Sequence, residues 1–123
     1  PNFSPYEIAS KDNGHVVVHR KAMRGLQKVR DKFGEALAIN SAYRTPEHNK
    51  NVGGSPKSQH VEGLAFDIAL RGGTITETQA MGDRIEELAI AAGFTAIGRY
   101  HSFIHIDMRP PKEDGSLYYW DMR

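Results

Sequence analysis

The sequence predicts a single domain of α+β class, and three observations lead to that prediction. Two segments, at about residues 16–33 and 76–92, place apolar residues at the spacing of an amphipathic helix. Three segments, at residues 37–41, 64–70 and 94–109, show the alternation or the β-branched and aromatic content of strands. A length of 123 residues suits one hydrophobic core and is too short for two.

Composition narrows the class of protein further. The chain has 25% charged and 39% hydrophobic residues, as folded globular domains do. Its formal net charge of +1 gives no general attraction to nucleic acid or to an anionic membrane, so neither is expected as a partner. Cysteine is absent, so a metal would have to be held by His, Asp or Glu. No apolar run approaches the roughly 18 residues of a membrane span, and the N-terminus lacks the pattern of a signal peptide.

The N-terminal part is expected to form an arm followed by a helix. Residues 1–14 are polar and contain several turn-forming residues, which predicts a short arm ending in a turn. The helix over 16–33 would bury one apolar stripe and end at Gly34. Basic residues on its other faces are interrupted by acidic ones and lack interleaved aromatics, which favours a solvated face over a nucleic-acid surface. The apolar stripe consists of Ala22, Leu26, Val29 and Phe33.

The next segment predicts a strand, a short helix and a loop. Residues 37–41 suit a buried strand that runs into polar residues. Thr45 is a suitable N-cap for a short helix at 46–51, and paired glycines with a proline make 52–56 a loop. Arg44 would stand at the mouth of that helix, well placed to bind an anion, with a surface salt bridge as the alternative.

The strand expected at 64–70 has two different faces. One face is apolar and would join the core, whereas the other consists of small residues around the carboxylate of Asp67. The core face carries Phe66, Ile68 and Leu70, and the other carries Ala65, Asp67 and Ala69. Gly63 permits a bend ahead of the strand, so His60 could arch back over Asp67. This arrangement leaves room over the sheet for an ion and a substrate.

A second amphipathic helix is expected over 76–92. A capping box of Thr76 and Gln79 would open it, and Gly93 would end it. The acidic pair at 86–87 predicts a solvated face. No residue of this helix suggests a chemical role, so we expect it to be scaffold.

Residues 94–109 predict a β-rich run in which Gly98 permits a bend or a bulge. In its second half the apolar side chains would face the core, and a histidine and two charged residues would share the opposite face. The core face carries Ile104, Ile106 and Met108, and the other carries Phe103, His105, Asp107 and Arg109. The tail at 111–123 contains Tyr118, Tyr119 and Trp120, which we expect to pack onto the body or to rim the site.

His60, Asp67 and His105 form a candidate metal site. Catalytic zinc takes three protein ligands from His and carboxylate and keeps a fourth position for water or substrate. Residue type and spacing alone leave an equal alternative, which is structural histidines with a capping aspartate, because the chain has six histidines.

Three segments of the chain resemble one family, in the right order. Ser58-x-His60-x-x-Gly63-x-Ala65-x-Asp67 resembles the signature of the zinc D-alanyl-D-alanine carboxypeptidases of peptidase family M15, which include phage L-alanyl-D-glutamate endolysins. The resemblance extends to residues 41–49 and to residues 98–109. It implies a Hedgehog/DD-peptidase fold, a small antiparallel sheet with helices on one side.

The resemblance also implies roles for individual residues. His60, Asp67 and His105 would bind Zn²⁺. Arg44 would hold a substrate carboxylate or stabilise the oxyanion, and Ser58 would support the site or touch substrate. The substrate would be the stem peptide of bacterial peptidoglycan. The enzyme would then act as a monomer on the cell wall, in the periplasm or during phage lysis of a host.

The general base departs from the family pattern. Many members carry an acidic residue three positions before the last histidine, and this chain has Ser102 there. Two substitutes are available, His101 and Asp107. His101 has a suitable unperturbed pKa of about 6.5. Asp107 is ionised but would alternatively orient a ligand or pair with Arg109.

Three functions from different classes remain open at this level. The first is a zinc peptidase that acts on peptidoglycan, which the resemblance favours. The second is a zinc-bearing binding module of the same fold without turnover, which the missing acidic residue keeps open. The third is an interaction domain without metal. Metal content and turnover separate the three.

Overall fold

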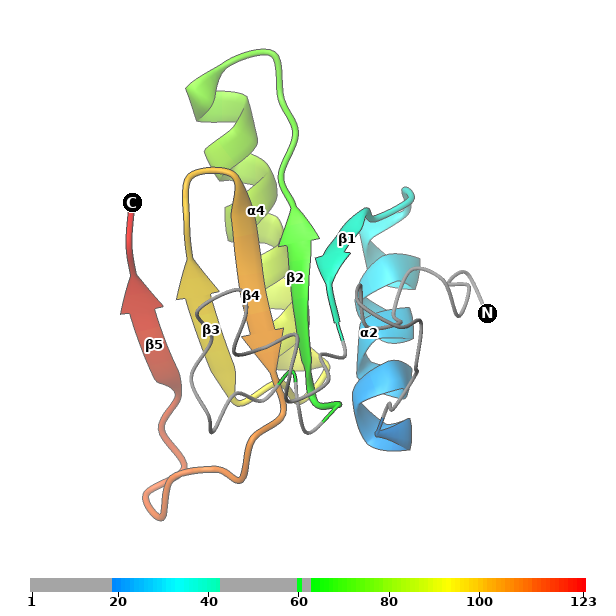
Figure 1. The fold of residues 1–123 in the computed structure, drawn as a ribbon, viewed down its shortest axis with the longest axis vertical. Helices are drawn as coiled ribbons and strands as arrows, with labels where there is room; N and C mark the ends of the chain where they lie inside the picture. Colours follow the sequence, from blue (N-terminus) through cyan, green and yellow to red (C-terminus); the bar gives the residue numbers. More distant parts are fainter. Residues whose placement is uncertain (1–18, 43–59, 61–62) are drawn as a thin grey trace.

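A computed structural model of the chain describes residues 19–42, 60 and 63–123. These residues contain two helices and five strands, which confirms the α+β class (Figure 1). The helices are α2 (Arg20–Phe33) and α4 (Ile75–Ala91), and the strands are β1 (Ile39–Ser41), β2 (Ala65–Ala69), β3 (Ala96–Arg99), β4 (Phe103–Asp107) and β5 (Tyr118–Asp121). The predicted arm at 1–14, short helix at 46–51 and loop at 52–56 lie outside the described residues.

The five strands form one sheet in the order β1-β2-β4-β3-β5. Neighbouring strands are antiparallel except β3 and β5, which are parallel, so the sheet is mixed and not wholly antiparallel as expected. The reason is the path of the chain after β4. It returns to the end of the sheet where β3 begins, and the N–H of Tyr118 donates to the carbonyl of Thr95 there (3.0 Å). The predicted tail therefore contributes an edge strand (Figure 1).

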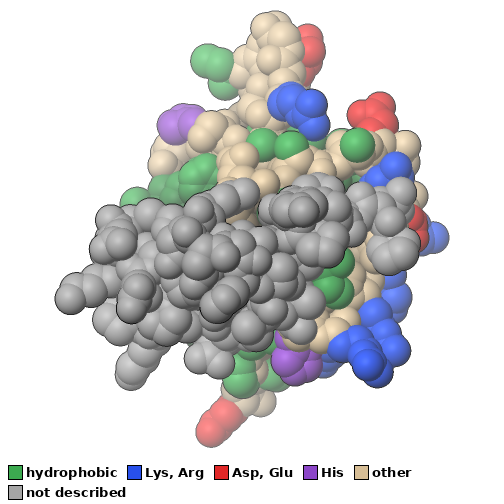
Figure 2. All heavy atoms as spheres, turned by 45° about the vertical axis from the view of Figure 1, so that its right-hand side comes forward, with side chains coloured by type: hydrophobic (Ala, Val, Ile, Leu, Met, Phe, Trp, Pro, Cys, Tyr) green, Lys and Arg blue, Asp and Glu red, His purple; other side chains and the backbone are tan. Residues whose placement is uncertain are grey.

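Helix α2 buries the predicted stripe. Ala22, Leu26 and Val29 are fully buried, and Gly34 ends the helix in the left-handed conformation (φ 83°), as predicted. Its basic side chains are exposed except that of Arg30, which is half-buried, and this agrees with a solvated face. Lysine and arginine gather along one side of the molecule in Figure 2. The described helices do not have the length and apolar character that a membrane span requires.

The start of α4 corrects a prediction. The cap is Thr74 instead of Thr76, because the Thr74 hydroxyl accepts the backbone N–H of Glu77 (3.0 Å). The Glu77 carboxylate in turn accepts the backbone N–H of Gly73 (3.1 Å). The same Thr-x-x-acid spacing that defines a capping box therefore occurs two residues earlier, directly after the turn of residues 71–73.

The β-rich run of residues 94–109 is a hairpin of β3 and β4, not one bent strand. The chain reverses over residues 100–102, where the N–H of Tyr100 donates to the carbonyl of Phe103 (3.2 Å). No glycine or proline marks this turn, so composition placed the bend at Gly98 instead. Gly98 lies inside β3, opposite both His105 and Trp120.

One face of the sheet carries the core and both helices pack on it. Phe66 and Ile68 of β2 and Ile104 and Ile106 of β4 are fully buried against α2 and α4, as the alternation predicted. Burial of such a side chain contributes about 1.5–3 kcal/mol. The other face of β2 and β4 is thereby free to carry polar groups.

A buried arginine on the core face of the sheet binds α4, which the sequence analysis did not predict. Arg99 of β3 is only 2% exposed, and its guanidinium contacts Asp83 (2.9 Å) and Glu86 (3.0 Å) of α4. Glu86 was expected on a solvated face. It instead joins α4 to the sheet, because a buried guanidinium requires a partner of opposite charge.

Candidate metal centre

Asp67 and His105 stand side by side on neighbouring strands. They are direct partners in the antiparallel register of β2 and β4. Side chains of such partners project from the same face with Cβ atoms about 4.5–5.5 Å apart. The alternation that sends Phe66, Ile68, Ile104 and Ile106 into the core therefore sends Asp67 and His105 to the opposite face, as predicted.

His60 reaches the same place from the turn that precedes β2. Gly63 closes this turn with a positive φ of 71°, and its N–H donates to the carbonyl of His60 (3.2 Å). His60 is 3% exposed, and its Nδ1 donates to the carbonyl of Ala42 (2.5 Å). A carbonyl only accepts, so the proton of His60 is on Nδ1 and the lone pair is on Nε2. The predicted return of His60 over Asp67 is thus present.

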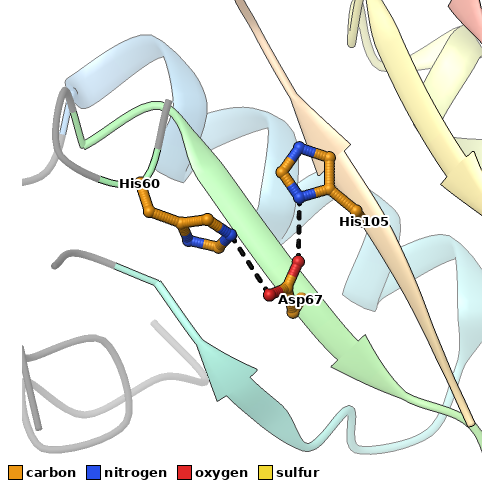
Figure 3. Close-up of side chains that lie close together, drawn as sticks. All are labelled: His60, Asp67 and His105. Atoms are coloured by element: carbon orange, nitrogen blue, oxygen red, sulfur yellow. Dashed lines mark hydrogen bonds and ion pairs between the residues drawn. The ribbon is translucent and has the colours of Figure 1, made fainter. Parts of the chain in front are cut away.

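Asp67 lies between the two histidines (Figure 3). One carboxylate oxygen is 3.2 Å from Nε2 of His60, and the other is 2.8 Å from Nδ1 of His105. The second ring nitrogen of His105, Nε2, is 2.7 Å from the carboxylate of Asp107. His105 therefore meets a carboxylate oxygen at each nitrogen.

The donor set fits a divalent cation. A neutral imidazole carries one N–H, and when His105 donates it to Asp107, its Nδ1 presents a lone pair towards Asp67. His60 presents a lone pair from Nε2. The ligand atoms of His60, Asp67 and His105 lie within 4.8 Å of one another. Three lone pairs that converge in this way need a positive charge between them, and two imidazoles with one carboxylate are a ligand set of catalytic zinc.

The charges of the site point the same way. Burial raises the pKa of Asp67, but hydrogen bonds with His105 and His60 outweigh it and hold the pKa well below the ordinary value. Burial also opposes ionisation of Asp107, yet hydrogen bonds from Arg109 and His105 lower its pKa to about 2. Burial lowers the pKa of His105, and the bonds to Asp107 and Asp67 more than reverse this, so the pKa is raised. Without a metal ion, the two carboxylates therefore favour the protonated, positively charged form of His105.

Asp107 makes the contacts of a residue that orients His105. It is fully buried, and Arg109 binds both of its oxygens through Nε (2.9 Å) and Nη2 (2.6 Å). The oxygen that Nη2 of Arg109 contacts, Oδ2, is also the one that contacts Nε2 of His105. Of the two roles considered for Asp107, these contacts correspond to orientation of a ligand and pairing with Arg109.

His101 is not brought into the His60, Asp67 and His105 group. It is exposed in the β3–β4 turn and lines a surface hollow with residues from the start of α4. Its carbonyl accepts from the side chain of Gln79 (3.4 Å). Arg44 and Ser58 lie outside the described residues, so their roles stay predictions.

Two groups beside the site had little or no sequence signal. The carbonyl of Ala42 fixes His60, and a backbone group carries no mark in the sequence. Trp120, expected only to pack or to rim the site, lies against His105 with ring centroids 5.2 Å apart.

The chain was compared with protein families and with curated proteins. No curated protein matches the chain. The family model described as Peptidase M15 matches residues 1–107, which include all three members of the candidate metal group. This match covers most of the 123 residues. The chain therefore belongs to the peptidase M15 family.

Proposed function

We propose that the protein is a zinc-dependent peptidase that hydrolyses the peptide part of bacterial peptidoglycan. The observation that carries this proposal is the carboxylate of Asp67 between ring nitrogens of His60 and His105, with ligand atoms of all three residues within 4.8 Å of one another. Membership of the peptidase M15 family supports peptide hydrolysis as the reaction. The resemblance of the Ser58–Asp67 segment to peptidoglycan carboxypeptidases and endolysins supports the choice of substrate.

His60, Asp67 and His105 would hold the ion. Bound zinc supplies a water whose pKa is lowered to about 7 and a Lewis acid for the scissile carbonyl. The chain supplies the rest. The carbonyl of Ala42 keeps the lone pair of His60 on Nε2, and Asp107 keeps that of His105 on Nδ1. Arg44 would offset negative charge on the reacting oxygen or on a substrate carboxylate.

The proposal is tested with purified murein sacculi and zinc-loaded protein. We expect release of soluble peptide fragments, and mass spectrometry of the muropeptides identifies the bond, either D-Ala-D-Ala or L-Ala-D-Glu. His60→Ala should abolish release because it removes one ligand. His19→Ala, a change at an exposed histidine just ahead of α2, is the matched control and should leave release unchanged. Zinc-loaded protein that leaves murein intact would rule out this function.

The two predicted bases are separated by single substitutions. A general base contributes about 10²–10⁴-fold to the rate. If His101 is the base, His101→Ala lowers kcat by that factor and leaves zinc content unchanged. If Asp107 only orients His105, Asp107→Asn lowers zinc affinity as well. Zinc content measured beside kcat distinguishes the two.

A second candidate is a zinc-bearing binding module without turnover. One observation favours it: Asp107 is already engaged by Arg109 and His105, and Ser102, where many family members carry an acid, is exposed. Such a module would co-sediment with sacculi in the presence of zinc and release nothing. The enzyme would release fragments under the same conditions.

We further propose that the protein acts as a monomer on the cell wall. Either a phage lysis enzyme or a bacterial wall enzyme fits this proposal. Lysis of bacteria when the protein is expressed with an export signal, and its absence in the His60→Ala variant, tests the location. Sedimentation of the purified protein tests the oligomeric state.

A further inference from the structure

We propose that Trp120 is a positioning residue for His105, so that the C-terminal strand β5 completes the metal centre. The inference rests on the metal site of the proposed function and not on its substrate. Trp120 lies beyond residues 1–107, the part of the chain that matches the family. The contact therefore joins His105, within the matched region, to a residue outside it.

The sheet aligns four residues of the site in one row. The register pairs Asp67 of β2 with His105 of β4, His105 with Gly98 of β3, and Gly98 with Trp120 of β5. Neighbouring strands are about 4.8 Å apart, so the backbones of His105 and Trp120 are separated by roughly twice that distance. Their ring centroids are nevertheless only 5.2 Å apart. The indole must therefore lie across the strand between them.

Gly98 makes this crossing possible. A Cβ atom at position 98 would clash with the indole of Trp120, since three ring atoms lie well inside contact distance of that position. Any other residue in the middle of the row would keep Trp120 away from His105. The glycine that composition marked as a bend thus has a different use, which is close approach of a side chain to the backbone.

Two polar contacts hold the indole in place. Its Nε1–H donates to the hydroxyl of Tyr100 (2.8 Å). The guanidinium of Arg109 stands 5.3 Å from the centre of the Trp120 ring, and the same guanidinium binds Asp107. Trp120 and Asp107 are therefore parts of one connected group around His105.

The imidazole of His105 is restrained from two directions. Asp107 contacts Nε2 at 2.7 Å, and the indole of Trp120 packs against the ring with an angle of 42° between the two ring planes. The contacts of its two nitrogens with Asp67 and Asp107 leave the ring able to tilt about the line that joins these nitrogens. The indole opposes the tilt, which keeps Nδ1 directed at Asp67. Residues that orient a metal ligand in this manner typically raise metal affinity 10- to 100-fold.

Zinc affinity of full-length variants tests the proposal without any substrate. Trp120→Leu keeps an apolar side chain and removes the ring, whereas Trp120→Phe keeps a ring. Tyr119→Ala is the matched control, since Tyr119 is the neighbouring residue of β5 and is 49% exposed. We expect Trp120→Leu to weaken zinc binding about 10-fold or more, Trp120→Phe to recover most of the loss, and Tyr119→Ala to bind as the parent does. Competition with a chromophoric chelator gives the Kd.

A second readout separates positioning from simple stability. Co²⁺ in the site reports ligand geometry through its visible absorption, and Trp120→Leu should change that spectrum. A folded Trp120→Leu protein with the Kd and the Co²⁺ spectrum of the parent would overturn the proposal. This holds even if the melting temperature of the variant is lower than that of the parent. If Trp120→Leu does not fold, Tyr100→Phe, which removes only the partner of the indole, must weaken zinc binding or the proposal fails.

The possible failures are distinct. If the parent protein binds zinc tightly but leaves murein intact, the proposed function is wrong and the proposed role of Trp120 is unaffected. A parent that binds no zinc would remove both.

Discussion

Asp107 is fully buried, and its carboxylate binds two partners, Arg109 and His105. The pairing with Arg109 keeps Asp107 ionised, and an ionised carboxylate can only accept hydrogen bonds. When a cation occupies Nδ1 of His105, the proton of the ring is therefore held at Nε2, where Asp107 accepts it. One buried side chain thus selects the tautomer of a residue that would bind metal.

Asp107→Asn should disturb that selection. The amide of asparagine can donate to Nε2 of His105, which would move the proton to Nδ1, the nitrogen that faces Asp67. We expect zinc affinity to fall about 10- to 100-fold, as it does when a residue that orients a ligand is lost. Asp114→Asn, at an exposed aspartate, is the control and should not change the Kd. An unchanged Kd in Asp107→Asn would contradict the tautomer assignment.

The metal-free protein should be most stable in mildly acidic solution. The pKa of Asp107 is lowered to about 2, so its contribution is present above the ordinary carboxylate range and is lost as the pH falls towards that value. The pKa of His105 is raised above 6.5, so its contribution is present below that value and is lost as the pH rises through the raised pKa. Thermal melts in the presence of chelator, from pH 3 to 9, should show a maximum between these limits. A melting temperature that does not fall on the alkaline side would contradict the role of His105.

At the scale of elements, the start of α4 offers a sharp test. Thr74→Ala removes the side chain that accepts the N–H of Glu77 and should cost about 1 kcal/mol of unfolding free energy. Thr76→Ala lies in the same helix turn, is also exposed, and should cost far less. Urea denaturation of both variants measures the difference. Equal costs would mean that Thr74 is not the cap.

Several elements could be predicted because each depends on its own residues. Alternation at 64–70 located both the core face of β2 and Asp67, and apolar spacing located the buried stripe of α2. The hairpin of β3 and β4 was not predicted, because residues 100–102 contain no turn-forming glycine or proline. Glu86 was misread because its partner, Arg99, is supplied by another element. Local pattern identifies an element but not what packs against it.

The candidate site divides in the same way. Asp67 and His105 could be placed on polar faces from the alternation of side chains alone, and the bend at Gly63 brought His60 towards Asp67. The family resemblance then favoured a metal site over structural histidines. The carbonyl of Ala42 could not be predicted, because every residue has a carbonyl and only the folded path brings this one to His60. The contact of Trp120 with His105 depends on the parallel pairing of β5 with β3, a tertiary choice without a local pattern.

At the scale of the whole molecule, the sheet separates two environments. The helices and the core occupy one face, and the candidate metal group stands on the other. The three ligands come from the turn before β2, from β2 and from β4, so a bound ion would join segments that are 38 residues apart between Asp67 and His105. Metal binding should therefore stabilise the fold as a whole.

Removal of metal should lower the melting temperature. A ligand that binds only the folded state stabilises it by about 2.7 kcal/mol when its free concentration is 100-fold above Kd. We expect chelation to lower the melting temperature by several degrees, measured by calorimetry. His60→Ala, which lacks one ligand, should show no such difference between chelator and zinc. An unchanged melting temperature in the parent would count against a metal site in the folded protein.

The single row of Asp67, His105, Gly98 and Trp120 has a consequence for folding. Side chains alternate between the two faces of a sheet, so a slip of one residue in any strand would exchange the faces of all its side chains. If β4 slipped by one residue, Ile104 or Ile106 would stand opposite Asp67 and His105 would enter the core. Such misaligned chains could not bind the ion. Metal binding would then favour chains in which β2 and β4 have paired in the correct register.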